Sequence, residues 1–572
     1  MVNTEQLYEL WLERAVDDPD IKAELLSMKG DEKAIYECFY RELEFGTGGL
    51  RGVIGAGSFR MNVYTICRAT QGLANYIKGK CKNPSVAIAY DSRIKSDAFS
   101  KAAAEVLAGN GIKVYIYPEL MPTPMLSFAV RQLKTDAGIV VTASHNPAKY
   151  NGYKVYGSDG CQMTDNDATA VFECIEKVDT FDGVTKTAFE KGIADGMICY
   201  IGQEMIDNYL DKVASRSVNP EMLKGCDLKV IYTPLNGAGN MPVRKILDKS
   251  GILDVTVVPE QEMPDGSFPT IPFPNPEIKQ VFEIAIDMAK TLNSDLLLAT
   301  DPDCDRVGIA VRHAGDYVLM SGNEVGVMLL NYLLEQKGKK ETLSKNPIAV
   351  KTIVTTPLAA LVAQKYNCEI IDVLTGFKYI GEQIGFLEAK GEEERYVFGF
   401  EESYGYLAGG YVRDKDAVVS SMLICEMTAF YKKQGKTLID IMDDLYKEYG
   451  YFINSQLSFQ FEGSTGMEKM GNIMNRLHES TLRKIGDYEV SVCADYLNSV
   501  STELKSGEKT EITLPKSDVL SYTLKNGASV IVRPSGTEPK LKVYVSSKGE
   551  TREQAEKLND VLKDLCTDII EK

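Results

Sequence analysis

The sequence predicts an α/β protein with three successive βαβα domains that have mixed or parallel sheets, then a smaller α+β domain, arranged around one central cleft. Two observations predict this fold. Apolar runs alternate with amphipathic stretches three times along the chain, which is the pattern of strands joined by the helices that cover them. Each round ends in a polar loop directly after a buried strand, and such loops meet at the carboxyl edge of a sheet.

The repeats set the expected domain bounds. A chain of 572 residues suits about four domains of roughly 150 residues each. We expect a helical extension over residues 1–40, followed by domains over 41–205, 206–315, 316–448 and 449–572.

The elements are expected in the same order in each of the first three domains. In the first, a strand and turn are expected at 85–93 and further strands at 112–118 and 137–141, with helices at 96–111 and 123–133. The same order returns from 227 to 300 and again from 347 to 400. The pattern then changes, and 529–547 is expected to form a strand, a loop and a second strand.

Charge and composition exclude some classes of partner. The net charge of −17 and the sequence pI near 5.0 argue against binding to nucleic acid or to an anionic membrane, because the overall field repels phosphate. The N-terminus lacks the basic and apolar regions of a signal peptide, and no apolar run reaches the length of a membrane span. The twelve cysteines are scattered without a CxxC pair, as is typical of reduced core thiols. We therefore expect a cytoplasmic protein.

The segment TASHNP, residues 142–147, follows an apolar run and places His145 directly after Ser144. Asn146 precedes a proline, which favours extended backbone. In extended backbone, neighbouring side chains point to opposite faces, so we expect His145 to be badly placed to take a proton from Ser144. The GxSxG signature of the α/β-hydrolases is also missing here. A hydrolase that uses Ser144 and His145 is therefore disfavoured.

The segment DPDCDR places Asp301, Asp303 and Asp305 two residues apart after a buried strand. This spacing can turn all three carboxylates toward one point, where they repel one another unless a cation lies among them, and hard oxygen ligands suit Mg²⁺. A calcium-binding EF-hand would need glycine and glutamate where Arg306 and Arg312 stand. Two alternatives remain: a solvated acidic turn, or an aspartyl-phosphate phosphatase that matches D-x-D-x-[T/V] and uses Asp303 as its nucleophile.

Two loops in the second half of the chain have residues suited to phosphate and sugar. RPSGTEPK, beginning at Arg533, offers a guanidinium, two hydroxyls and a glycine, which are the parts of a phosphate site, although a tight hairpin loop would look the same. EESYG, residues 401–405, offers acceptors for sugar hydroxyls, and its alternative is the start of a helix with acidic first-turn residues.

Three basic residues lie in shorter loops. TGGLRG contains Arg51 and NGYK contains Lys154, and each segment alone reads as a turn. RDKDA places Lys415 between two acids, where the alternative is a surface ion pair that contributes little stability.

A serine loop, an acidic loop, a sugar loop and a phosphate loop therefore occur in that order, one in each domain. In this combination the chain resembles the α-D-phosphohexomutase superfamily from about Glu42 to the C-terminus. The opening ELEFGTGGLRG, preceded by a helical extension, resembles the longer branch of that superfamily, which includes phosphoglucomutases, phosphopentomutases and a glucose-1,6-bisphosphate synthase.

The resemblance implies a role for each loop. Ser144 would be a phosphoserine that carries the transferred group, and its phosphate oxygen would join Asp301, Asp303 and Asp305 as ligands of Mg²⁺. Proton transfer would fall to Arg51, Lys154 or Lys415, with His145 lining the site. The implied substrate-binding residues are Arg306, Gly376, Glu401, Ser403, Arg533, Ser535, Gly536 and Thr537.

The implied activity is that of a phosphoglucomutase, which interconverts glucose 1-phosphate and glucose 6-phosphate through glucose 1,6-bisphosphate. Gly405 stands where the short bacterial phosphomannomutases have histidine, which disfavours a preference for mannose and puts more weight on Lys415. The alternatives are a phosphopentomutase or phosphomannomutase, a metal-dependent sugar-phosphate phosphatase, and a non-catalytic sugar-phosphate sensor. The expected partners are small-molecule sugar phosphates, and both monomer and dimer remain open.

Overall fold

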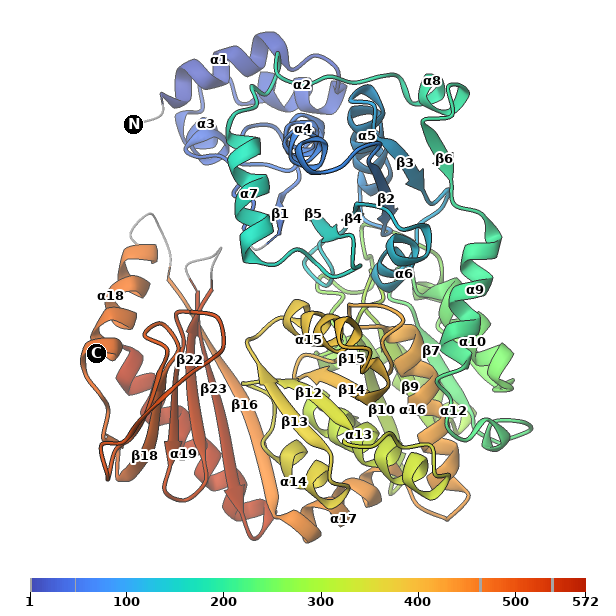
Figure 1. Ribbon diagram of the computed structural model, residues 1–572, viewed down its shortest axis with the longest axis vertical. Helices are drawn as coiled ribbons and strands as arrows, with labels where there is room; N and C mark the ends of the chain where they lie inside the picture. Colours follow the sequence, from blue (N-terminus) through green and yellow to red (C-terminus); the bar gives the residue numbers. More distant parts are fainter. Residues whose placement is uncertain (1–2, 47, 462–465, 536–539, 572) are drawn as a thin grey trace. The chain divides into compact units, whose positions relative to one another are not determined.

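The computed structural model describes residues 3–46, 48–461, 466–535 and 540–571 (Figure 1). The chain forms two compact units, and each is built from separate stretches of sequence. The first unit comprises 1–322, 377–398 and 403–437, and the second comprises 323–376, 399–402 and 438–572. Within the described ranges, no helix has the length and apolar character needed to cross a membrane.

Three short helices form the expected N-terminal extension: α1 (Thr4–Arg14), α2 (Pro19–Ser27) and α3 (Glu32–Phe39). Each begins after an Asn or Asp side chain that accepts a backbone N–H of the first turn, as helix N-caps do. Their apolar faces share one core around Trp11, which also contains Tyr64 and Phe181 from the following domain. The extension is thus packed against the first domain.

The first sheet has six strands in the order β1-β5-β4-β2-β3-β6. Strands β4, β2, β3 and β6 run parallel, whereas β5 is antiparallel to both β4 and β1. The strands are β1 (Gly49–Val53), β2 (Ser85–Tyr90), β3 (Lys113–Ile116), β4 (Ala137–Val141), β5 (Tyr150–Gly157) and β6 (Ile198–Tyr200).

Helices join the strands of the first sheet as the repeat predicts. Those of this domain are α4 (Val63–Lys80), α5 (Ser96–Gly109), α6 (Thr123–Leu133), α7 (Asp165–Glu176), α8 (Phe189–Ala194) and α9 (Gln203–Ala214). Side chains of α4, α5 and α7 share one core with the strands, and α6 packs against β2 and β4. The apolar strand β4 is buried along its whole length and delivers the loop that contains Ser144.

The second sheet has five strands in the order β11-β10-β9-β7-β8. Strands β8, β7 and β9 are parallel to one another. Strand β10 is antiparallel to both of its neighbours, β9 and β11. The elements are β7 (Val230–Thr233), α10 (Asn240–Ser250), β8 (Val255–Val257), α11 (Pro259–Glu262), α12 (Glu283–Leu292), β9 (Leu296–Thr300), β10 (Val307–His313) and β11 (Asp316–Met320), with short 3-10 helices at Pro220–Met222 and Lys279–Phe282. The acidic segment 301–306 is the connection between β9 and β10.

The third repeat also has the expected order of elements. It contains α13 (Gly322–Lys339), β12 (Ile348–Thr352), α14 (Leu358–Lys365), β13 (Glu369–Val373), α15 (Phe377–Ala389), a 3-10 turn at Glu393–Arg395, β14 (Tyr396–Glu401), β15 (Gly405–Leu407), α16 (Ala417–Lys432) and α17 (Leu438–Tyr449). Strands β12 and β13 are parallel neighbours, as in a βαβ unit.

The C-terminal sheet has the order β16-β23-β22-β21-β18-β19-β20, with β17 paired to β18, and its pairs are antiparallel. Its elements are β16 (Tyr451–Gln460), α18 (Gly466–Glu479), β17 (Lys484–Ile485), β18 (Tyr488–Asp495), β19 (Val500–Glu503), β20 (Lys509–Glu511), β21 (Leu520–Leu524), β22 (Ser529–Pro534), β23 (Lys540–Gly549) and α19 (Arg552–Glu571). The expected strand, loop and strand over 529–547 correspond to β22 and β23.

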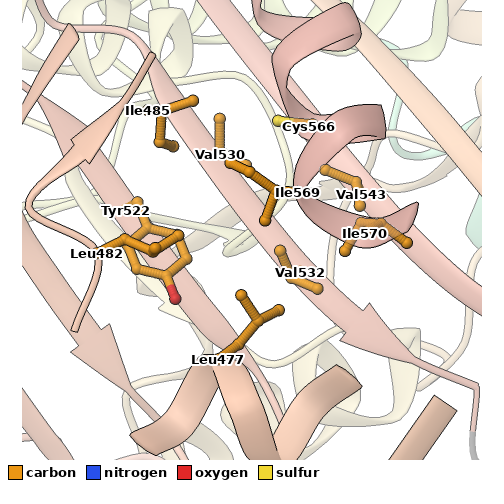
Figure 2. Close-up of a pocket in the computed structure, with 10 residues that line it drawn as sticks. All are labelled: Leu477, Leu482, Ile485, Tyr522, Val530, Val532, Val543, Cys566, Ile569 and Ile570. Carbon is orange, nitrogen blue, oxygen red and sulfur yellow. The ribbon is translucent and has the colours of Figure 1, made fainter. Parts of the chain in front are cut away.

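The core of this C-terminal domain contains a small cavity, shown in Figure 2. Apolar side chains from the sheet and from α18 and α19 surround it, and Tyr522 is the one lining residue with a polar hydroxyl. The volume of about 10 Å³ is the room of one water molecule at most. A sugar phosphate does not fit in this cavity.

Candidate active site

Ser144 lies in the loop after β4 and is nearly buried, at 8% exposure. Its hydroxyl donates a hydrogen bond to Asp301 Oδ2 at 2.7 Å, and its Oγ lies 3.2 Å from His145 Nδ1. The expectation that Ser144 and His145 point to opposite faces is therefore wrong. The reason is the backbone of Ser144, which is left-handed with φ 51° and not extended.

His145 is a neutral imidazole in this environment. Burial lowers its pKa well below the ordinary value, and the positive charges of Arg306 and Arg51 lower it further. A neutral ring nitrogen can accept a hydrogen bond. The position of His145 relative to Ser144 therefore no longer argues against Ser144 as a nucleophile. The carboxylate of Asp301 is the closer acceptor for the same hydroxyl.

The three aspartates converge as their spacing predicts. One carboxylate oxygen from each of Asp301, Asp303 and Asp305 lies within 4.8 Å of the others, and all three side chains are buried. The alternative of a solvated acidic turn is therefore wrong. Burial raises the pKa of Asp301 well above its ordinary value and raises that of Asp305 to about 6, with the neighbouring carboxylates adding to both shifts. Such a group of buried acids favours a positive charge among them.

The oxygen atoms of this loop suit a hard cation. Asp303 Oδ1 and Asp305 Oδ1 are buried and accept no hydrogen bond from any residue that the structure describes. Unpaired buried carboxylate oxygens are costly unless a ligand completes them, and Mg²⁺ prefers oxygen ligands of this kind. The donor set of Asp301, Asp303 and Asp305 thus fits a magnesium ion.

Two lysines supply positive charge beside the acids. Lys154, on β5, lies with Nζ 3.1 Å from Asp303 Oδ2 and 3.7 Å from Asp305 Oδ2. Lys415 Nζ lies 2.9 Å from Asp305 Oδ2 and is buried, so the alternative of a surface ion pair at RDKDA is wrong. Burial would lower the pKa of Lys154, but Asp303 and Asp305 raise it above its ordinary value. Lys154 is thus held as a cation, and the same attraction keeps the pKa of Asp303 low against the effect of burial.

Arg306 joins the acidic loop to the segment after β14. Its guanidinium donates to the carbonyl oxygen of Ser403 at 3.2 Å and to Glu277 at 3.0 Å. The backbones of Arg306 and Gly405 also form an isolated antiparallel β-bridge. Arg51 is an exposed residue on β1, opposite Gly152 in the register with β5. Thr47, the first residue of TGGLRG, lies outside the described residues.

The second unit contains Gly376, the first part of the sugar loop and the phosphate loop, whereas Ser403 belongs to the first unit. Glu401 is buried at the end of β14, and the next residue, Glu402, accepts hydrogen bonds from the hydroxyls of Thr352 at 3.2 Å and Thr355 at 3.5 Å. Gly376 follows β13 with φ 122°, a conformation that a residue with a side chain rarely adopts. These residues bring carboxylates, hydroxyls and free backbone together at the carboxyl ends of β12, β13 and β14.

Arg533, Glu401 and Glu402 of the second unit all act on the Tyr544 hydroxyl. It hydrogen-bonds the Tyr544 hydroxyl; burial raises the pKa of Tyr544, and the negative charges of Glu402 and Glu401 raise it further. The phosphate loop begins here, and the Ser535 N–H donates to the carbonyl of Lys540 at 2.7 Å. Gly536 and Thr537, the other residues expected to bind phosphate, lie outside the described residues.

Several residues around Ser144 went unnoticed in the sequence. Asp91 and Arg93, after β2, contact the Ser144 loop, and Thr123 donates to Asp303 Oδ2 at 2.9 Å. In the second unit, Lys351 pairs with Asp372 at 2.6 Å beside the hydroxyl-rich turn that contacts Glu402. One signal was available: YDSR follows a buried strand, which is the same placement that singled out the other loops.

Comparison with known proteins places most of the chain in one group. Models of four phosphoglucomutase/phosphomannomutase domains match it in sequence: α/β/α domain I over 42–182, domain II over 207–315, domain III over 321–449 and the C-terminal domain over 496–565. A phosphoglucomutase of Staphylococcus epidermidis is 37% identical over 525 residues, which cover 91% of this chain and 93% of that protein.

Two further relatives extend the comparison. A probable phosphomannomutase of Haemophilus influenzae is 36% identical, over 87% of this chain and 95% of its own length. The crystal structure of a Thermus thermophilus protein described as a phosphomannomutase has the same fold. Its TM-score is 0.68 at 22% identity, and the match covers 93% of this chain and all of that one. Together with the four matched domains, these relatives confirm the α/β architecture expected from the repeats.

Proposed function

Because the chain belongs to the phosphoglucomutase/phosphomannomutase family, whose members are isomerases, we propose that it interconverts glucose 1-phosphate and glucose 6-phosphate by way of a phosphoserine at Ser144. One observation carries the proposal: Ser144 Oγ lies 2.7 Å from Asp301 Oδ2, at the edge of three converging carboxylates flanked by two lysines. Phosphoryl transfer through a loose transition state needs positioning and charge neutralisation more than a strong base, and this arrangement supplies both.

Mg²⁺ held by Asp301, Asp303, Asp305 and a phosphate oxygen of phosphorylated Ser144 would neutralise the charge of the transferring phosphoryl group. The protein's own residues do the rest. When Ser144 is unphosphorylated, Asp301 accepts the hydrogen bond of its hydroxyl, and neutral His145 is a second acceptor 3.2 Å from the same oxygen. Lys154 and Lys415 hold positive charge beside the acids, and Arg306 adds a guanidinium next to the loop.

For proton transfer at the sugar oxygen we favour Lys415. Lys154 is held as a cation by Asp303 and Asp305, which suits charge compensation better than proton abstraction. Arg51 offers several N–H donors in a planar fork, which suits binding of a phosphate more than the removal of a proton. Lys415 also pairs with Asp305, at 2.9 Å, and the weight on it comes from the resemblance, because Gly405 stands where the short bacterial phosphomannomutases have histidine.

The sugar loop, the turn at Gly376 and the phosphate loop are proposed to bind the substrate. Glu401, Ser403 and the backbone at Gly376 would bind sugar hydroxyls, and Arg533 and Ser535, with Gly536 and Thr537, would hold the phosphate that does not react. A planar guanidinium binds phosphate through two parallel hydrogen bonds, which suits a group that must be gripped in both orientations of glucose 1,6-bisphosphate. The bisphosphate is the proposed intermediate and activator.

Two alternatives make different predictions. The relatives include a probable phosphomannomutase, so preference for mannose or pentose phosphates is tested with the same enzyme on glucose 1-phosphate, mannose 1-phosphate and ribose 1-phosphate. A phosphatase that uses Asp303 would release inorganic phosphate, keep activity in Ser144→Ala and lose it in Asp303→Asn. The proposed mutase would lose activity in Ser144→Ala and in excess chelator.

Phosphorylation of Ser144 is a direct test. Protein purified from cells should contain a fraction phosphorylated at Ser144, because each turnover returns a phosphate there, and peptide mass spectrometry would detect it. An unmodified Ser144 in protein that is fully active without added glucose 1,6-bisphosphate would rule out the carrier role. We further propose that the protein works in the cytoplasm, with sugar phosphates as its small-molecule partners.

A further inference from the structure

The backbone of the Ser144 loop is held in a conformation that the chain alone disfavours. Ser144 has φ 51°, in the left-handed region, which for a residue with a side chain costs roughly 1–3 kcal/mol unless the surroundings enforce it. The bonds of its Oγ cannot enforce this conformation throughout a reaction in which Oγ carries a phosphate for part of the time. Whatever fixes the loop must therefore bind its backbone.

We propose that the segment Asp91–Arg93 is the positioning element that fixes the backbone of Ser144: Arg93 binds the carbonyl oxygens of the loop, and Asp91, through Thr142, binds its amide. This inference rests on the proposed function for its role in phosphoryl transfer, although the contacts themselves are structural. Both residues lie directly after β2, the strand next to β4 in the sheet.

Arg93 contacts four carbonyl oxygens of the loop. One terminal nitrogen donates to the carbonyl of Ser144 at 2.6 Å and also to that of Asn146, and the other donates to those of Pro147 and Tyr150, each at 3.0 Å. Its side chain is completely buried, beside the Asp91 carboxylate at 3.4 Å and 5.0 Å from the centre of the Phe268 ring. Only a planar fork with several donors can reach four acceptors arranged in this way, so lysine is not an equivalent replacement.

Asp91 holds the backbone N–H of Ser144 through the Thr142 side chain. One of its carboxylate oxygens accepts the Thr142 hydroxyl at 2.6 Å, and the Thr142 oxygen accepts the Ser144 N–H at 2.8 Å. Its other oxygen accepts the Arg93 N–H at 2.9 Å and the Ser96 hydroxyl at 2.8 Å. Both the amide and the carbonyl of Ser144 are thus bonded, and neither bond uses the reactive oxygen.

The segment itself is anchored outside the loop. Lys95 forms ion pairs with Asp18 at 3.1 Å and Asp20 at 2.6 Å, in the N-terminal extension. Arg93 forms a bridge with Gly266, where a side chain would collide with the backbone of the 92–94 turn. A segment held at both sides is rigid enough to impose a conformation on its neighbour.

The first test replaces Arg93 by lysine and compares Arg68→Lys as a matched control. Arg68 also donates to a backbone carbonyl, that of Val178, and forms an ion pair with Glu42. It therefore makes the same kinds of contact as Arg93 but does not touch the Ser144 loop. In Arg93→Lys we expect kcat to fall about 100-fold with KM nearly unchanged, because a small misplacement of the reacting oxygen is costly and the residue touches no substrate. Arg68→Lys should keep kcat.

A second variant covers the case in which Arg93→Lys does not fold. Thr142→Val removes the oxygen that accepts the Ser144 N–H at almost unchanged volume, whereas Thr142→Ser retains it. We expect Thr142→Val to lower kcat without raising KM, and Thr142→Ser to restore it. Equal kcat values in Thr142→Val and Thr142→Ser, or a kcat within about twofold of the parent protein in folded Arg93→Lys, would overturn the proposal.

A readout independent of turnover separates this inference from the proposed function. Hydrogen exchange of the amides over 142–150 should become about tenfold faster or more in Arg93→Lys and remain unchanged in Arg68→Lys. If the parent protein lacks mutase activity but the exchange result holds, the proposed function fails and the positioning role stands. If exchange over 142–150 is unchanged in folded Arg93→Lys, the positioning role fails whatever the activity.

Discussion

Replacement of Phe39 by alanine tests whether the N-terminal helices unfold together with the first domain. Phe39 is completely buried at the end of α3, and its ring centre lies 6.1 Å from that of Tyr8 and 5.8 Å from that of Trp11. Trp11 in turn lies 5.5 Å from both Tyr64 and Phe181, which belong to the first domain. The aromatic cluster is therefore continuous from the extension to the domain.

The expected loss of stability follows from this burial. Truncating a fully buried phenylalanine to alanine costs about 3–5 kcal/mol. If the extension and the first domain form one cooperative unit, this amount is lost from the free energy of unfolding of both. For a unit of about 150–250 residues, 1 kcal/mol shifts Tm by roughly 2–4 °C, so the melting temperature of the unit should fall by about 6–20 °C.

The assay uses the single tryptophan of the chain. Because Trp11 is the only one, its fluorescence reports this core alone, while hydrogen exchange of amides in β2 and β4 reports the first sheet. Both signals should change in one transition, and Phe39→Ala should shift both equally. Tyr36→Ala is the matched control, since Tyr36 lies on the same helix but is 53% exposed, and surface changes usually alter stability by about 0.5 kcal/mol or less.

Separate transitions would refute the reasoning. If Phe39→Ala shifted the Trp11 signal and left exchange in β2 and β4 unchanged, the helices would unfold by themselves. Their contacts with the first domain would then contribute no stability to it.

Three further predictions concern the second unit. Arg533→Ala should raise KM for glucose 1-phosphate about ten- to a hundredfold, because a lost charge-assisted hydrogen bond costs about 1.5–3 kcal/mol; an unchanged KM would remove this residue from the phosphate site. Burial alone would lower the pKa of His478, but its hydrogen bonds to Asp518 and Asp495 raise it, so the stabilisation is complete below the unfolded value of about 6.5 and is lost as pH rises through the folded value. His478→Asn should therefore destabilise the C-terminal domain more at pH 6 than at pH 9 in urea unfolding, and an equal loss at both would contradict this. Tyr522→Phe should leave stability unchanged or raise it by about 1 kcal/mol, because the buried hydroxyl has no hydrogen-bond partner among the described residues; a clear drop in Tm would show that it has one.

Periodicity was sufficient to predict the elements of the first three domains. Strands such as 137–141 and 295–300 are continuous apolar runs, and each is followed by a turn with polar residues, which is why the loops that contain Ser144 and Asp301 could be placed at strand ends. The convergence of the three aspartates also followed from their spacing alone. Local pattern is sufficient where one short segment determines the result.

Features that depend on distant contacts could not be predicted in this way. The left-handed backbone of Ser144 is hydrogen-bonded by Arg93, which follows a different strand, as well as by Thr142 within TASHNP. For Lys415 the sequence left open a surface ion pair and a role in proton transfer, and its burial beside Asp305 appears only in the folded chain. In both cases the deciding partner comes from another strand or another domain.

The discontinuous first unit has a consequence for synthesis on the ribosome. Asp305 emerges about 110 residues before Lys415, so at roughly 5–20 residues per second the acidic loop waits about 5–20 s for the cation that lies 2.9 Å from it in the finished protein. During that interval, Lys154 is the only one of the two lysines that has been synthesised and can pair with Asp303 and Asp305. A polypeptide released before residue 415 therefore lacks one of the cations that pair with the acidic loop in the finished protein.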